Sequence, residues 1–224
     1  MPDNTARPKV QEQPGLMIFL GCYAIFGCAV FALSILIADF VVPDHDWIAD
    51  TISDLGAGKY EFIVDIGIYA FSSALICVAL LTAHVHLGGL RWSVSIVGLV
   101  ALGLIVFLVG ARNEYGDSDN DGVVIHRYLV YGLGFLMASL PLLMAKAAGR
   151  ADPLYSKILV AISVVWVPSA PIFFFLPDAI DGVYERYLGL ISFVFVITLS
   201  HLFIQRGRSQ KAAKRRKEAK NASA

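Results

Sequence analysis

Three residues have the side-chain types of a metal site or an acid–base pair: Asp54, His126 and Glu185. Histidine titrates near neutral pH and is a common metal ligand, and carboxylates act as general acids and bases or bind hard cations. We expect these residues to be catalytic groups or metal ligands in one outward-facing pocket. A divalent metal is therefore the cofactor that this pattern would accommodate.

Three further residues are expected to bind a substrate: Asp65, Arg127 and Arg186. The arginines suit a phosphate or carboxylate head group, because guanidinium donates paired hydrogen bonds to such groups. Asp65 lies four residues after Glu61 and seven before Ser72, a spacing that places all three on one helix face. The alternative is a belt of structural ion pairs that ties helix ends together.

The acidic segment 117–122 resembles the start of a calcium-binding loop, with Asp117, Asp119 and Asp121 as the ligands. The twelfth position of that loop is Tyr128, whereas an EF-hand needs a bidentate glutamate there, so an EF-hand is excluded. Two interpretations of this segment remain open: a weak calcium site and a solvated acidic turn.

Long apolar segments must position these residues. The chain of 224 residues is 57% hydrophobic and 16% charged, whereas soluble domains average about 25% charged residues. Six segments reach the roughly 20 residues that cross a bilayer. They are 16–40, 62–83, 93–111, 128–145, 158–176 and 187–204. This pattern predicts an all-α membrane protein, a six-transmembrane-helix bundle built from three hairpins.

Basic and acidic residues separate onto opposite sides of the predicted bundle. Eight of the 18 Lys and Arg residues lie in the tail 206–224, whereas acids gather between 39 and 65, 114 and 121, and 178 and 185. The positive-inside rule then places both termini in the cytoplasm of a multi-pass protein of the cell membrane. No ionisable residue lies near the middle of a predicted span, which favours chemistry at the outer interface over transport through the midplane.

Three regions follow from this topology: an N-terminal cytoplasmic tail (1–15), a membrane domain (16–205) and a basic cytoplasmic tail (206–224). The first apolar segment is too long for the core of a cleaved signal peptide, so it is expected to be a retained span. The tail is either a solvated, partly helical segment or an anchor to anionic lipid.

The second and third hairpins are predicted to be repeats. Residues 121–129 match residues 181–188 after a one-residue gap, which aligns His126 with Glu185 and Arg127 with Arg186. If the repeat is real, both arginines should point into the bundle. A pair of histidines on the opposite side, His86 and His201, leaves haem binding as a further alternative.

The loop after the first span contains Ile52-Ser53-Asp54-Leu55-Gly56-Ala57, in which Ser53 could cap a helix and the glycine lets the chain turn back over the bundle mouth. With the six-span plan and a histidine at the start of the fourth span, this run resembles the prokaryotic membrane family catalogued as domain of unknown function 998, from 16 to 204. The resemblance implies fold and membrane location but no activity, and it marks Asp54 and His126 for testing first.

The expected function is to bind or modify a lipid or other amphiphile at the outer leaflet, with metal-assisted hydrolysis as the enzymatic form. The alternative is a non-catalytic membrane sensor or assembly protein, and small-molecule transport ranks third. Membrane lipid is the expected partner. No nucleic-acid motif is present, and the sequence does not identify which proteins, if any, are partners.

Overall fold

The computed structural model describes residues 12–56, 59–111 and 125–223, and all the regular structure in these ranges is helical. The six long helices are α1 (Pro14–Val41), α3 (Glu61–His84), α4 (Leu90–Ala111), α5 (Ile125–Ala148), α6 (Pro153–Phe173) and α7 (Asp181–Ala222). Each is long and apolar enough to cross a membrane. The predicted six-helix membrane bundle is therefore confirmed, and the chain is a multi-pass membrane protein.

The last two helices begin earlier than hydropathy predicts. α6 starts at Pro153, because the carboxylate of Asp152 accepts the amide hydrogen of Leu154 at 2.8 Å and proline favours a first helical turn. α7 starts at Asp181 and continues without interruption to Ala222, so the basic tail is helical as far as Ala222. Hydropathy reports only the apolar part of a helix and misses such polar ends.

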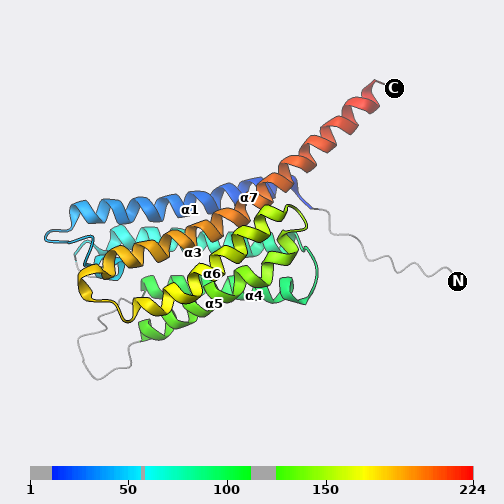
Figure 1. Cartoon of the computed structure of the whole chain (residues 1–224). Helices are drawn as coiled ribbons and strands as arrows, with labels where there is room; N and C mark the ends of the chain where they lie inside the picture. Colours follow the sequence, from blue (N-terminus) through cyan, green and yellow to red (C-terminus); the bar gives the residue numbers. More distant parts are fainter. Residues whose placement is uncertain (1–11, 57–58, 112–124, 224) are drawn as a thin grey trace.

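The long helices form a closed ring in chain order, in which each packs on the next and α7 returns to α1. α3 also contacts α7 across the ring. We call the end that carries segments 42–60 and 174–180 the acidic end. The opposite end, the basic end, carries the start of α1 and segments 85–89 and 149–152. Beyond this end the C-terminal part of α7 projects away from the bundle (Figure 1).

Small residues bring α1 and α3 close together. A Cβ at Gly27 would lie 2.6 Å from the carbonyl oxygen of Ala70, and one at Gly67 would overlap Ser34 Oγ. Ser72 serves packing as well, since its hydroxyl donates to the carbonyl of Gly103 on α4 at 2.8 Å. Ser72 therefore joins two helices and does not share a pocket with Asp65.

Contacts at the basic end fix both chain ends on the same side. Arg206 donates two hydrogen bonds of 2.7 Å to the carboxylate of Glu12, and the amide nitrogen of Gln13 donates to His84 Nε2 at 2.8 Å. His86 lies 2.9 Å from Ser93 Oγ, and His201 lies 3.0 Å from the hydroxyl of Tyr155. The histidines have separate local partners, which gives a haem pair no support.

The two arginines that the sequence alignment equates have different environments. Arg186 is largely buried, with 14% of its side chain exposed, whereas Arg127 is exposed. The expectation that both arginines point into the bundle is therefore wrong. Of the shared pairs, Asp121-Gly122 lies outside the described residues, and the Arg-Tyr pairs lie near the starts of α5 and α7, which does not require equivalent packing.

Candidate functional site: a cavity beneath a docked loop

The loop between α1 and α3 docks onto the first turn of α7. The amide nitrogens of Gly182 and Val183 donate to the carbonyls of Ala49 and Ile48 at 3.1 and 3.0 Å. These amides are among the first donors of the helix and have no partner within it, so the loop satisfies them. A Cβ at Gly182 would overlap the carbonyl of Asp50, and only glycine allows this approach.

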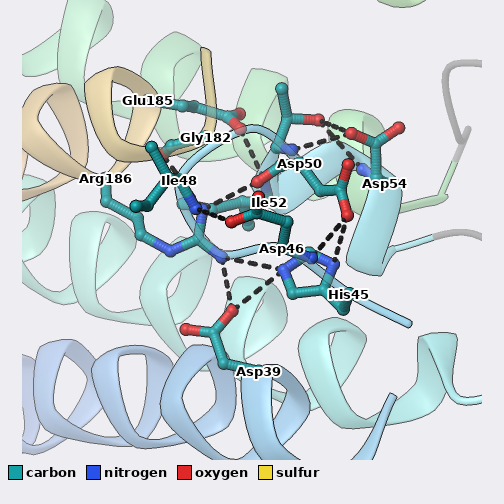
Figure 2. A network of polar contacts seen from close by, with 11 residues as sticks. Asp39, His45, Asp46, Ile48, Asp50, Ile52, Asp54, Gly182, Glu185 and Arg186 are labelled. Atoms are coloured by element: carbon teal, nitrogen blue, oxygen red, sulfur yellow. Dashed lines mark hydrogen bonds and ion pairs between the residues drawn. The ribbon is translucent and has the colours of Figure 1, made fainter. Parts of the chain in front are cut away.

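Arg186 lies at the centre of a polar network between α1, the loop and α7 (Figure 2). Its Nη1 donates to the carbonyls of Asp50 and Gly182, at 3.0 Å each, and its Nη2 donates to the carboxylate of Asp39. His45, with 4% of its side chain exposed, lies 3.1 Å from the carboxylate of Asp39 and 3.4 Å from that of Asp50. We call Asp39, His45, Asp50 and Arg186 the Arg186 network.

Within the docked loop, Ile52–Leu55 forms the short helix α2. Its cap is Thr51, not the predicted Ser53: the hydroxyl of Thr51 accepts from the amide of Asp54 at 3.1 Å, and the Asp54 carboxylate accepts from the amide of Thr51 at 2.7 Å. The carboxylate of Glu185 accepts from the amide of Ile52 at 2.5 Å and from the hydroxyl of Ser53 at 3.4 Å. Glu185 therefore holds α2 against α7.

A cavity of about 630 Å³ lies beneath α2, between α3, α4, α5, α6 and α7. Its inner part is aromatic: Phe31, Phe71 and Phe193 have ring centroids 5.4–5.8 Å apart. Four polar side chains line the part near the acidic end. They are Ser53, Asp65, His126 and Glu185. The carboxylates and His126 thus lie near one end of the cavity, and the lining toward the middle of the bundle is mostly apolar.

The cavity also reaches the lateral surface. Phe135 on α5 and Val167 on α6 both line it, and they are 71% and 53% exposed. Between these helices the indole of Trp166 donates to the carbonyl of Gly134 at 2.9 Å. A Cβ at Gly134 would meet no atom within 4 Å, because that position borders the open cavity.

The structure divides the predicted six-residue site. Asp65, His126 and Glu185 line the cavity, and His126 is only 8% exposed. Asp54 instead lines a smaller acidic hollow together with Asp50, Asp178 and Asp181. The two arginines lie elsewhere, one in the Arg186 network and the other exposed. The loop path, which the Gly182 contact determines, turns Asp54 toward its own cap and away from the cavity.

The described residues contain no group of three His, Cys, Asp or Glu side chains that could hold a metal ion. Asp54, His126 and Glu185 therefore do not make a three-residue metal site there. The calcium candidates Asp117, Asp119 and Asp121 lie outside the described residues.

Sequence reasoning missed the role of His45. It lies in a loop with Asp44 and Asp46, a composition typical of solvated turns, and its partner Arg186 is 141 residues away. The aromatic lining was missed as well, since Phe31 and Phe193 look like ordinary span residues. Only the ring of helices brings these groups together.

A family model described as protein of unknown function (DUF998) matches residues 25–202, which is most of the chain and includes every residue of the cavity and of the Arg186 network. No curated protein and no solved structure matches the chain.

Proposed function

We propose a function from the cavity itself, because the chain belongs to the DUF998 family, whose description states no activity: the protein binds a lipid or similar amphiphile. The apolar chain would lie among the aromatic residues and the head group beside Asp65, His126 and Glu185. The single observation that carries this proposal is a mostly apolar cavity with its carboxylates and His126 near one end and an opening onto the lateral surface.

The size and place of the cavity suit this role. Ligand sites are typically about 300–1,000 Å³, apolar for the most part, with a few placed polar groups, and 630 Å³ lies within that range. A lateral opening between α5 and α6 would let a lipid enter from the bilayer without passing through water. A soluble metabolite would need no such opening.

The proposal includes an orientation in the cell membrane. Both termini would lie in the cytoplasm, because Arg91, Arg150 and the basic part of α7 all lie at the basic end. The polar end of the cavity would then lie at the level of the outer leaflet.

Filling the cavity tests the proposal. Gly134→Phe adds a ring where a Cβ meets nothing within 4 Å, so the cavity should fill while the helices keep their packing. Gly15→Phe is the matched control, since Gly15 also has open space around it and does not line the cavity. Native mass spectrometry of protein purified in mild detergent would count bound lipids. We expect Gly134→Phe to lose a lipid that the wild type and Gly15→Phe retain; equal occupancy in all three would refute the proposal.

The Arg186 network favours one second candidate, a non-catalytic sensor or assembly protein. Its four residues are joined to one another and none of them lines the cavity, as expected of structural ion pairs. If the cavity proves empty of lipid, this candidate is the one to keep.

A further inference from the structure

The head group should decide which amphiphile the cavity selects. A lipid tail that leaves the bilayer for an apolar cavity moves between two hydrocarbon-like surroundings, so it gains little hydrophobic free energy. Selectivity then depends on the polar end of the cavity. The chemistry of that end can be read from its charges and rings.

Asp65 is a carboxylate of α3 that lines the cavity about one turn inside the helix start. No hydrogen bond or ion pair joins it to another residue within the described ranges. Its neighbour one turn toward the acidic end is Glu61, which carries the same charge. A carboxylate at the edge of an apolar span is costly unless a cation or donor meets it.

None of the described Lys and Arg residues near this end is paired with Asp65. Arg186 is held by Asp39 and two carbonyls, and Lys59 lies over the ring of Tyr60, 5.5 Å from its centroid. Arg127 is exposed and does not line the cavity. No Lys or Arg is among the described residues that line it. As far as the described residues go, the polar end is therefore acidic, which disfavours the phosphate head group that the arginines first suggested.

Aromatic rings accompany the carboxylate at this end. Tyr131 of α5 and Phe174, just after α6, line the cavity with centroids 5.2 Å apart, and Phe173 lies 5.6 Å from Phe174. Ring faces attract ammonium groups, and a cluster of rings is a recurring site for quaternary ammonium ligands.

We infer that the cavity selects amphiphiles whose head group is an ammonium, with Asp65 as its counter-ion and Tyr131, Phe173 and Phe174 as the surrounding rings. This inference rests on the proposed function and adds the chemical class of the ligand. An alkyl chain that carries an amine or a quaternary ammonium fits it, and an alkyl phosphate does not.

Three probes with the same twelve-carbon chain test the inference: dodecyltrimethylammonium, dodecyl phosphate and dodecanol. Each is titrated calorimetrically into the purified protein in dodecyl maltoside, with Gly134→Phe as the blank for micelle partitioning. A charge-matched contact in a low-dielectric site should make the ammonium probe bind about tenfold tighter than the phosphate probe. Asp65→Asn should weaken ammonium binding by about tenfold and leave dodecanol binding unchanged.

Glu61→Gln is the matched control, because Glu61 carries the same charge one turn away from Asp65 but does not line the cavity. It should change ammonium binding by less than about twofold. Dodecyl phosphate binding as tightly as the ammonium probe, or an unchanged preference in Asp65→Asn, overturns the inference and leaves the proposed function standing. If none of the three probes binds the wild type above the blank, the proposed function fails and the inference fails with it.

Discussion

Replacing Arg186 with methionine should destabilise the folded protein by about 3 kcal/mol, because it leaves the largely buried carboxylate of Asp39 without its main cation. Removing one partner of a buried ion pair costs about 3–5 kcal/mol. Two carbonyls, of Asp50 and Gly182, also lose a donor. His45 Nε2 remains 3.1 Å from the Asp39 carboxylate and can donate to it, which places the loss at the lower end of that range.

Reversible unfolding in mixed micelles with increasing sodium dodecyl sulfate, followed by circular dichroism, measures this loss. Arg127→Met is the matched control, since it removes the arginine that the sequence aligns with Arg186 but that the structure leaves exposed; it should change the unfolding free energy by less than about 0.5 kcal/mol. Asp39→Asn should cost less in the Arg186→Met protein than in the wild type, by about 0.5–3 kcal/mol. Equal losses for the two arginine variants, or additive effects of Arg186→Met and Asp39→Asn, would show that the network does not stabilise the fold.

Three further outcomes follow from the described contacts. Gly182→Ala should destabilise the protein by about 1–3 kcal/mol and expose the loop 42–60 to protease, because the new Cβ overlaps the carbonyl of Asp50; an unchanged digestion pattern would contradict the close approach. The hydrogen bonds from Arg206 lower the pKa of Glu12, so the stability from this pair is present above the ordinary glutamate pKa of about 4.3 and is lost as the pH falls through the lowered value. The pair is partly exposed and should contribute only about 0.2–1 kcal/mol to the unfolding free energy. Glu12→Gln should therefore be less stable than the wild type by this amount at pH 7, and the two proteins should be equally stable at pH 3. A reporter fused after Lys220 should be active in its cytoplasmic form and inactive as a periplasmic phosphatase; the reverse result would invert the proposed orientation.

The six helices were predictable because a span must be long and apolar, and this requirement leaves a strong local signal. The start of α6 was not, since Asp152 and Pro153 define it through capping rather than hydropathy. The cavity residues Asp65, His126 and Glu185 could be grouped because topology alone places their helix ends on one side. The direction of Asp54 could not be predicted, since it depends on a loop that docks through contacts more than 130 residues apart in the chain.

Glu185 and Arg186 are consecutive residues near the start of α7, and they bind different elements. Glu185 binds α2, which lies over the cavity, and Arg186 binds α1 and the loop that follows it. Successive side chains on a helix are fixed about 100° apart, so a rotation of α7 about its axis would displace the contacts of Glu185 and of Arg186 together. No proline interrupts the 42 residues of α7, which reach about 63 Å at 1.5 Å per residue. One continuous helix therefore links the contacts of Glu185 and Arg186 at the acidic end to the charged segment that extends beyond the basic end.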